Sequence, residues 1–391
     1  MRKKVLLVLH RVPFPPIGGD SLTNYNLVRI LYEHFDLDIV TVTYEDYTKE
    51  AEEFLEAHSR SSKIFKFHKN RFIINAIKSF FNFKPLQINF FYFPEVQKYI
   101  NSKVKDTDLL FAGIVRIADY LWNFNKPKIL NMADSIGLNY KHSFRRTSSL
   151  FWRFVYLFEY PLMLRYERQM IDNFDRTLMF NRREIEFFNS PKIVQIPQSV
   201  KPELLNYDAA DEQYKKYISF FGKMNYRPNV DAVKWFVEKV FPHLPKEIHF
   251  QIIGANPVPE ILKLEKENSR IVVRGFVEDP YLMLKSSLCV VAPMQTGGGI
   301  QNKILETMAL GTIVITTPYS AFPIASKEDN ALLIADKPGE WVETIKDIYQ
   351  NPEKYSHFKK NSRKYIKSHF TFEKFSQKLL EVIDEVISAK N

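Results

Sequence analysis

The sequence has almost no cysteine and no long apolar run, and each absence excludes a class of protein. Cys289 is the single cysteine among 391 residues, so the chain can form no internal disulfide, which fits a reducing compartment. Cys289 also lies within an apolar run that is expected to be buried, which favours an inert thiol over a nucleophile. No stretch approaches the roughly 20 apolar residues that a membrane-spanning helix needs. The apolar run that starts at Val5 ends at His10, too early for a signal peptide, so we expect a cytoplasmic protein.

A metal-binding carboxylate pair at the carboxyl end of a strand is also missing. The pattern Asp-x-Asp occurs twice, at Asp36 to Asp38 and at Asp106 to Asp108. Both pairs precede the runs predicted as strands, so they are expected at the edge of the sheet opposite to the one that binds ligands in such folds. We interpret them as solvated loop residues and predict no metal site and no other cofactor.

What the sequence does have is basic charge mixed with aromatic side chains. The formal net charge is +10, and residues 58–105 hold ten Lys and Arg against the single acid Glu95, interleaved with phenylalanines. A second stretch of this kind runs from Lys141 to Tyr156. Such stretches suit the surface of an anionic membrane. The alternative is that the aromatic residues form the core and the cations a solvated face. A nucleic-acid-binding protein is a further alternative, but no known nucleic-acid motif is present.

Short β-branched runs alternate with helical patterns along most of the chain, which predicts an α/β protein with doubly wound parallel sheets. The first series of alternating runs ends near Pro197, and residues 199–212 are polar and unpatterned, which predicts a linker near residues 197–213. We therefore predict two domains, at 1–198 and 213–370, with a final helix at 371–391. The predicted strands lie at 4–9, 38–43, 62–67, 108–111, 128–132, 176–180, 192–196, 217–221, 249–254, 270–276, 288–292 and 312–317.

A glycine run between a buried strand and an amphipathic helix is the most informative segment. The strand ends near Ala292, and Thr296 to Gly299 let the backbone approach a ligand closely. The helix that follows aims its unpaired N–H groups and positive dipole end at an anion. We expect Ile300 to face inward on that helix, and Lys303 and Glu306 to share the side that faces the mouth of the site. A lysine there neutralises a diphosphate, and a carboxylate one turn later accepts hydrogen bonds from ribose hydroxyls. The alternative is an ordinary loop with a surface Lys and Glu.

This segment resembles the nucleotide-sugar site of family 4 glycosyltransferases, Glu-Gly-Phe-Gly-x-x-x-x-Glu-Ala-Met-Ala-x-Gly-x-Pro-Val. Glu306, Met308, Ala309 and Gly311 fall on the second half of that pattern. The first Glu of the pattern is Gly298 here. The run Gly-Gly-Gly-Ile-Gln-Asn-Lys-Ile-Leu-Glu is similar instead to a subgroup found among exopolysaccharide and capsule sugar transferases, with Gly-x-Gly-x-x-Asn-Lys-x-Leu-Glu.

The resemblance extends over nearly the whole chain and implies the GT-B architecture. In that architecture two Rossmann-like domains face each other across a cleft, the first on the acceptor side and the second binding the nucleotide sugar, and a C-terminal helix crosses back to the first. The implied reaction is retaining and metal-independent, and it moves a hexose-type sugar from a nucleotide-diphosphate sugar to a saccharide or polyprenyl-linked acceptor. From the basic aromatic stretches we expect peripheral association with the inner face of the cell membrane, and we expect no nucleic-acid partner.

The resemblance also implies roles for single residues. Gly18 and Gly19 in the first loop would approach the donor, and Asp134, which follows a predicted strand, would orient acceptor or sugar hydroxyls. His10 ends the first strand and is a second candidate near the cleft. In the second domain, the implied donor-binding residues are Gly222, Lys223, Arg227, Gly275, Phe276, Thr296, Gly297, Gly298, Gly299, Ile300, Lys303 and Glu306.

A second enzyme class remains open on the same architecture. A sugar-nucleotide epimerase, or another non-transferase, would also bind a nucleotide sugar between two such domains. It would need acidic and histidine side chains that converge on C2 of the sugar, and the sequence does not identify such a set.

Overall fold

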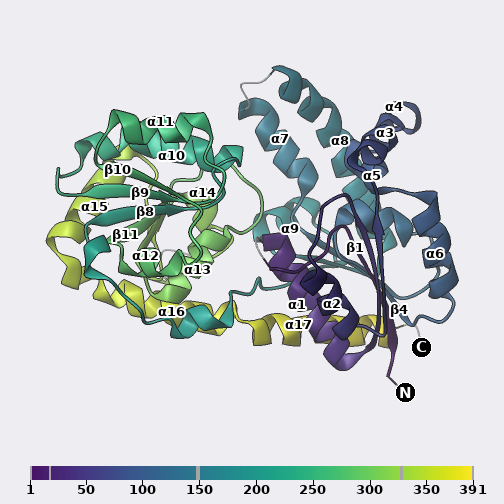
Figure 1. Cartoon of the computed structure of the whole chain (residues 1–391). Coiled ribbons are helices and arrows are strands. Elements are labelled where there is room, and N and C mark those ends of the chain that lie inside the picture. Colours follow the sequence, from purple (N-terminus) through teal and green to yellow (C-terminus); the bar gives the residue numbers. More distant parts are fainter. Residues whose placement is uncertain (1, 17–18, 147–149, 326–328, 390–391) are drawn as a thin grey trace. The chain divides into compact units, whose positions relative to one another are not determined.

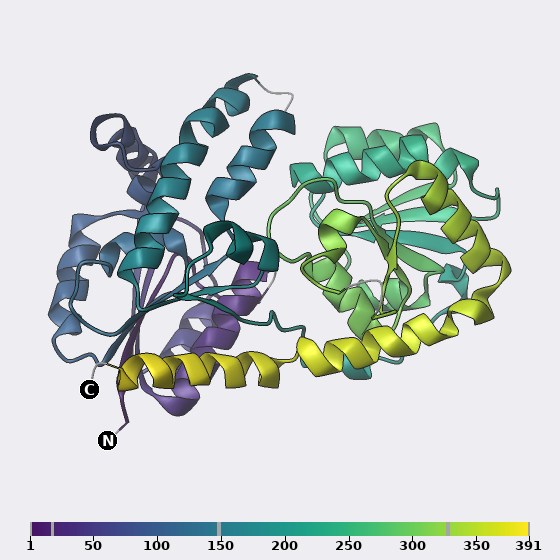
Figure 2. The ribbon, with the colours of Figure 1, turned by 180° about the vertical axis from the view of Figure 1, so that it is seen from behind.

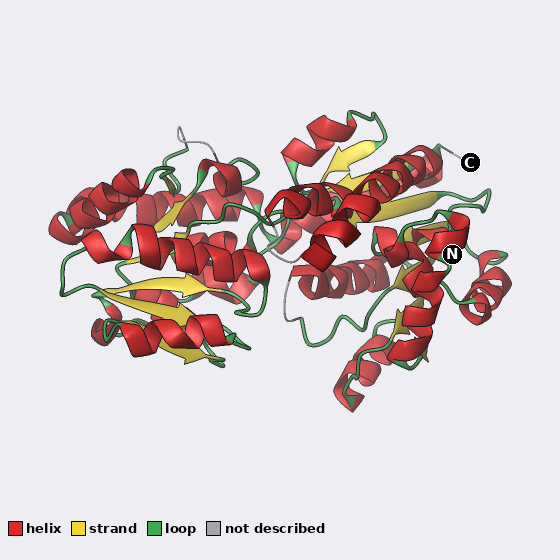
Figure 3. Cartoon of the chain, turned by 90° about the horizontal axis from the view of Figure 1, so that it is seen from above, coloured by secondary structure: helices red, strands yellow, loops and turns green. Residues whose placement is uncertain are grey.

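The computed structural model describes residues 2–16, 19–146, 150–325 and 329–389, and it divides the chain into two compact units (Figure 1). The first unit contains Met1–Ile196 and Phe375–Asn391, and the second contains Pro197–Lys374. Each unit is one parallel sheet with helices on both of its faces, as the view from above shows (Figure 3). The doubly wound α/β fold predicted from the sequence is thereby confirmed.

The first unit is built on a seven-stranded sheet in the order β3-β2-β1-β4-β5-β6-β7. Its central strand, β1, has the sequence KVLLVL and is buried on both faces, as apolar runs in parallel sheets are. Both neighbours pair with it in parallel, Lys4 opposite Asp36 on one side and Val5 opposite Leu109 on the other. The strands are β1 Lys4–Leu9, β2 Asp36–Thr43, β3 Ser61–Lys66, β4 Leu109–Ala112, β5 Lys128–Ala133, β6 Arg176–Met179 and β7 Ile193–Gln195.

The helices of the first unit include the C-terminal one, as the sequence predicted. Helix α17 lies beside the sheet of this unit (Figure 2), and Glu385 pairs there with Arg176 at the start of β6. Its side chains Phe375, Leu379 and Ile383 are buried. The helices are α1 Gly19–His34, α2 Lys49–Ala57, α3 Lys69–Ile77, α4 Ser79–Asn82, α5 Leu86–Phe91, α6 Pro94–Val104, η1 Val115–Tyr120, α7 Ile136–Arg146, α8 Leu150–Asn173, α9 Arg182–Phe188 and α17 Phe372–Ser388.

The second unit has a six-stranded sheet in the order β10-β9-β8-β11-β12-β13. Its core includes Phe236, Phe250 and Trp341, and Cys289 is buried within it, which raises the pKa of the thiol. The strands are β8 Tyr217–Phe221, β9 His249–Ile253, β10 Ile271–Gly275, β11 Cys289–Ala292, β12 Val314–Thr316 and β13 Leu333–Ile334. The helices are η2 Pro202–Asn206, η3 Glu212–Tyr214, α10 Arg227–Lys239, η4 Phe241–His243, α11 Pro259–Glu267, α12 Tyr281–Ser286, α13 Asn302–Leu310, α14 Pro318–Ala321, α15 Pro338–Gln350, η5 Pro352–Tyr355 and α16 Ser356–His369.

Three details of the sequence interpretation need correction. The two-residue strand β13 was not predicted, because two residues carry no readable periodicity. Residues 199–212 are not a free linker, since Leu204 in η2 is fully buried in the core of the second unit. Asp38 is not a solvated loop residue, since it is buried within β2 and accepts hydrogen bonds from Arg60 and Ser61.

Both sheets reverse the order of their strands at one place, and that place positions the candidate sites. In the first sheet the reversal falls between β1 and β4, and in the second between β8 and β11. The loops that leave neighbouring strands in opposite directions open a crevice at the carboxyl ends of the strands, where ligands bind in open α/β sheets. The residues that follow these four strands are therefore the ones to inspect.

Candidate functional site

The glycine run lies in the loop that connects β11 to α13, beside the reversal point of the second sheet. Gly297 has φ 115, a conformation that favours glycine, and its carbonyl accepts a hydrogen bond from Tyr319 Oη at 2.8 Å. The carbonyl of Gly298 accepts one from Gln301 Nε2 at 3.3 Å. These contacts hold the loop in one shape. The predicted residues of this loop are Thr296, Gly297, Gly298, Gly299 and Ile300.

Helix α13 begins at Asn302, later than the sequence predicted. The prediction placed Ile300 on the helix, and this is wrong because Ile300 lies in the loop that precedes it. Glycine loses the most backbone entropy in a helix, so the run of glycines delays the helix start. Gln301, at the N-cap, makes no side-chain capping bond. The first N–H groups of α13 thus lack a side-chain acceptor, which leaves them suited to an anion.

Lys303 is buried, and the charges of Lys303 and Glu306 act on each other. Its ammonium donates to Asn229 Oδ1 and lies 4.4 Å from the centre of the Phe220 ring. A Cβ at Gly222 would lie 3.1 Å from Lys303 Nζ and 2.7 Å from Asn229 Nδ2, so only glycine fits there. Burial lowers the pKa of Lys303 to about 7, against a partial rise from Glu306. The lysine is therefore held directly beneath the loop that follows β8.

Glu306 lies one turn further along α13, and its carboxylate has no hydrogen-bond partner among the described residues. Burial raises its pKa to about 7; Lys201 and Lys303 oppose this rise, and Glu203 adds to it. An unpartnered carboxylate that is largely removed from water is costly. Glu306 is thus placed to accept hydrogen bonds from a ligand.

The two other predicted cations of the second unit differ in their surroundings. Lys223 follows β8, is exposed, and forms no ion pair within the described residues. Arg227, the first residue of α10, pairs with Asp231 at 2.8 Å and with Glu260 at 3.4 Å. Its guanidinium is thus occupied by two carboxylates of its own unit, whereas the ammonium of Lys223 is available. A role for Arg227 on the donor diphosphate stays a prediction.

Gly275 ends β10 and Phe276 follows it at the same edge of the sheet. Nothing lies within 4 Å of a Cβ built on Gly275, so open space faces this backbone. Phe276 is 73% exposed, an unusual state for a large apolar side chain. The open backbone and the exposed ring together offer a platform for a flat ligand group.

The reversal point of the first sheet also carries ionisable side chains. His10 follows β1, Arg116 follows β4 and Asp134 follows β5, while Asp20 lies in the first turn of α1. His10 Nε2 lies 3.5 Å from Asp20 Oδ2, and burial lowers the pKa of His10 to about 4. Burial raises the pKa of Asp134; Arg116 and a hydrogen bond from Asn139 oppose this rise, and Asp20 adds to it.

Of the two predicted first-loop glycines, Gly19 lies within the described residues. Gly18 lies outside the described residues. Gly19 is the first residue of α1, and its carbonyl accepts a hydrogen bond from Thr23 Oγ1 at 2.9 Å. Gly19 therefore directly precedes Asp20, whose carboxylate lies 3.5 Å from His10.

Sequence reasoning did not single out several residues that the structure brings to these sites. In the second unit they are Asn229, which holds Lys303, and Lys201 and Glu203, which influence Glu306. In the first unit they are Asp20 and Arg116. Lys201 and Glu203 belong to the segment interpreted as a linker, and Asp20 directly follows the predicted first-loop glycines. No local pattern marks Asn229 and Arg116, because distant parts of the chain bring them to these sites.

The described residues contain no group of three or more His, Cys, Asp or Glu side chains that could hold a metal ion. Metal independence stays a prediction.

The chain is similar to known proteins both in sequence and in fold. Residues 215–351 match the family described as glycosyl transferases group 1. Among solved structures, Anabaena HepE in complex with UDP has a TM-score of 0.69 at 12% identity, over 98% of this chain and 100% of that one. Sucrose-phosphate synthase from Thermosynechococcus elongatus has a TM-score of 0.69 at 15% identity, over 99% and 100%. WaaG, a glycosyltransferase involved in lipopolysaccharide biosynthesis, has a TM-score of 0.67 at 13% identity, over 97% and 99%. No curated protein sequence matches the chain.

The fold and the matched domain define the class of protein. The chain has the GT-B fold of glycosyltransferases. More particularly, its second unit carries a group 1 glycosyltransferase domain, and the glycine loop, Lys223, Lys303 and Glu306 all lie inside the matched residues.

Proposed function

We propose that this glycosyltransferase is retaining and metal-independent and that it transfers a sugar from a nucleotide-diphosphate sugar to a polysaccharide or lipid-linked oligosaccharide acceptor. The observation that carries the proposal is the reversal point of the second sheet. There the unpaired Lys223 follows β8, the glycine loop leads into the uncapped start of α13, and α13 carries the buried Lys303 and, one turn later, the unpartnered Glu306.

The donor would bind with its diphosphate at the start of α13. Helix N–H groups and two lysines supply the positive field that two phosphates need. Glu306 would accept hydrogen bonds from ribose hydroxyls, and the base would lie against Gly275 and Phe276. Structures of HepE with UDP and with UDP-glucose support a nucleoside diphosphate as the ligand class.

Catalysis would come chiefly from stabilising the leaving group. As the bond between sugar and diphosphate breaks, negative charge grows on the diphosphate, and cations already fixed in place stabilise it without reorganisation. Lys223 and Lys303 would take the part that a divalent ion takes in metal-dependent transferases. At Gly298 no side chain is present to attack the sugar, which agrees with retention without a protein nucleophile.

The first unit would contribute the acceptor side. Asp134 would orient a hydroxyl of the acceptor or the sugar, and its raised pKa lets it also donate a hydrogen bond when protonated. Gly18 and Gly19 would allow close backbone approach, and His10, which lies beside Asp20, would face the same site. TarM in complex with Fondaparinux and alpha-GlcNAc-glycerol, and WaaG, support a saccharide acceptor. We further propose a cytoplasmic protein that associates with the inner face of the cell membrane.

The test is a screen of the purified protein against nucleotide sugars, scored by release of the nucleoside diphosphate in the presence of saccharide and polyprenyl-linked acceptors. The anomeric configuration of the product, measured by NMR, then tests retention. Release from no donor would reject the proposed reaction, and an inverted product would reject the mechanism.

A further inference from the structure

Exposed apolar side chains gather on two parts of the first unit. Most of the large apolar side chains that are exposed in the described residues lie on α3, on α4 with the residue after it, and on the first half of α8. Phe81 is 82% exposed and Leu150 is 80% exposed. We call this set the apolar surface. It consists of Ile73, Ile74, Ile77, Phe80, Phe81, Phe83, Leu150, Phe151, Trp152, Phe154, Leu157 and Phe158.

The aromatic residues of the basic segment 58–105 thus divide into two groups. Phe72, Phe91 and Phe93 are buried in the core of the first unit, as the core alternative expected. Phe80, Phe81 and Phe83 are exposed by 71% or more. Only the second group is available to a partner. Within residues 58–105, the strongly exposed phenylalanines therefore lie on the short helix α4 and directly after it.

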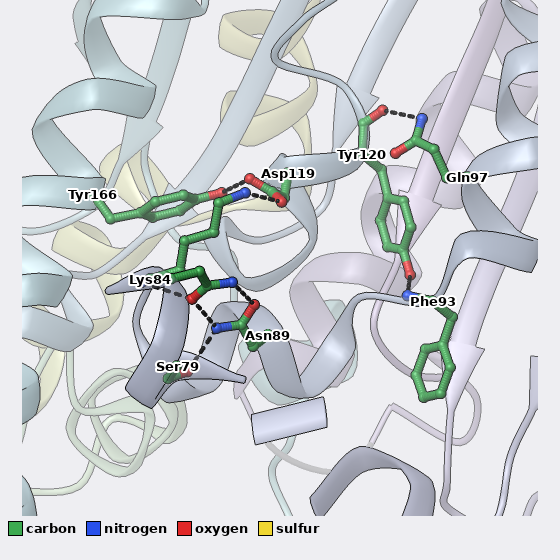
Figure 4. A network of polar contacts seen from close by, with 9 residues as sticks. Ser79, Lys84, Asn89, Phe93, Gln97, Asp119, Tyr120 and Tyr166 are labelled. Atoms are coloured by element: carbon green, nitrogen blue, oxygen red, sulfur yellow. Dashed lines mark hydrogen bonds and ion pairs between the residues drawn. The ribbon is translucent and has the colours of Figure 1, made fainter. Parts of the chain in front are cut away.

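A partly buried polar network holds the α4 side of the apolar surface in place (Figure 4). Asn89 of α5 donates to Ser79 of α4 at 2.7 Å, and both side chains are buried. Lys84, just after α4, pairs with Asp119 of η1 at 2.8 Å. Tyr166 of α8 donates to the same carboxylate at 3.4 Å. Because such a network orders the segment, the exposed phenylalanines are presented on a fixed backbone.

Helix α8 joins the same assembly. Its second half is buried through Met163, Tyr166 and Met170, whereas its first half extends beyond the core. Glu159, at the junction, accepts hydrogen bonds from the backbone N–H of Leu86 at the start of α5, at 3.0 Å. Figures 1 and 2 both show α8 beside α3, α4 and α5. The two parts of the apolar surface are therefore connected by hydrogen bonds that link α8 to α5 and η1.

Cations outnumber acids around this surface, and two of them are paired, Arg71 with Glu95 and Lys84 with Asp119. Residues 69–84 include Lys69, Arg71, Lys78 and Lys84 and no Asp or Glu. Residues 136–158 contain no Asp or Glu, and their described side chains include the cations Lys141 and Arg153. Self-association through this surface would bring cations against cations, which disfavours a second copy of the chain as the occupant.

We propose that the apolar surface is the site at which the protein docks on an anionic lipid bilayer. Its aromatic side chains enter the headgroup region, and the surrounding cations contact lipid phosphates. Within the described residues, no helix has both the length and the hydrophobicity to cross a bilayer. The docking itself does not depend on the proposed function. Only its biological role does, since docking would bring the first unit to lipid-linked acceptors.

Vesicle flotation with the full chain tests the docking. We expect binding to vesicles of phosphatidylglycerol and phosphatidylcholine and much weaker binding to phosphatidylcholine alone. The double variants Phe81→Ser with Phe83→Ser, and Phe151→Ser with Phe154→Ser, should each reduce vesicle binding roughly tenfold or more. The matched control is Leu262→Ser on α11 of the second unit, which removes an exposed leucine outside the apolar surface and should bind vesicles like the parent.

The fluorescence of Trp152 reports contact of the apolar surface with lipid. It is 49% exposed and should show a blue-shifted emission with vesicles, quenched by brominated lipid chains. Trp152→Phe should remove the quenching while vesicle binding persists, because phenylalanine remains apolar.

Calorimetric binding of a nucleoside diphosphate to each variant separates this inference from the proposed function and shows that the variants are folded. Loss of vesicle binding with nucleotide affinity retained supports the docking surface. Three outcomes would overturn it: equal vesicle binding by parent and aromatic variants, no binding of the parent to anionic vesicles, or a concentration-dependent dimer in sedimentation that the aromatic variants abolish.

Discussion

The reversal points of the two sheets occupy equivalent places but are built in different ways. In the second unit, one contiguous stretch from the glycine loop through α13 supplies Lys303 and Glu306, and the loop after β8 supplies Lys223. In the first unit, the cluster takes single residues from several segments, among them His10, Arg116 and Asp134. A site built from one contiguous stretch leaves a sequence motif, whereas a site assembled from scattered single residues does not. We therefore propose a division of work between the units: the second unit binds the diphosphate, and the first orients the hydroxyls.

The largest expected effect is on donor affinity. Lys223→Ala should weaken binding of a nucleoside diphosphate by about 1.5 to 3 kcal/mol, because it removes one charge-assisted contact. Isothermal calorimetry measures this directly. Lys266→Ala, at an exposed position on α11, is the control and should leave affinity unchanged. Equal affinity in both variants would remove Lys223 from the donor site.

Glu306→Gln should weaken nucleotide binding but raise the free energy of unfolding at high pH. It should weaken nucleotide binding by about 1.5 to 3 kcal/mol, since a charged acceptor is lost. Because burial raises the pKa of Glu306 to about 7 in the folded chain, the folded state binds this proton more tightly than the unfolded state, and the carboxylate costs stability once it ionises.

The variant should therefore raise the free energy of unfolding above pH 7, on the order of 2 kcal/mol, and match the parent below about pH 4. Denaturant titrations at several pH values measure the difference. A variant less stable than the parent at high pH would show that the carboxylate has a stabilising partner.

For the first unit, Asp134→Asn should lower turnover roughly tenfold, the value of about one hydrogen bond, and leave affinity for the nucleoside diphosphate unchanged. Steady-state kinetics and calorimetry give the two quantities. Asp106→Asn, an exposed position near the amino end of β4, is the matched control and should change neither. If Asp134→Asn weakens diphosphate binding as much as Lys223→Ala does, the division of work between the units is wrong.

A smaller effect is proton uptake on donor binding. Burial lowers the pKa of Lys303 to about 7, and two phosphates nearby would raise it again. At about pH 8, binding should take up a fraction of a proton, seen as a binding enthalpy that depends on the ionisation enthalpy of the buffer. The dependence should persist in Glu306→Gln and vanish in Lys303→Met; persistence in Lys303→Met would assign the proton elsewhere.

The smallest expected effect is that of a chelator. Transfer should continue at the parent rate in excess EDTA, because lysines and the start of α13 stabilise the leaving diphosphate. Loss of activity that Mg²⁺ or Mn²⁺ restores would contradict the proposed mechanism.

The sequence alone determined the α/β fold, the two parallel sheets and the glycine loop with Lys303 and Glu306. These features depend on local periodicity and on spacing within one segment, which a sequence displays directly. Tertiary structure alone decided that α13 starts at Asn302, that Lys303 is buried against Asn229, and that Lys201 and Glu203 influence Glu306. It also decided which phenylalanines of the basic segment are core and which are exposed. Burial and long-range contacts depend on which distant segments pack together, and composition cannot reveal that.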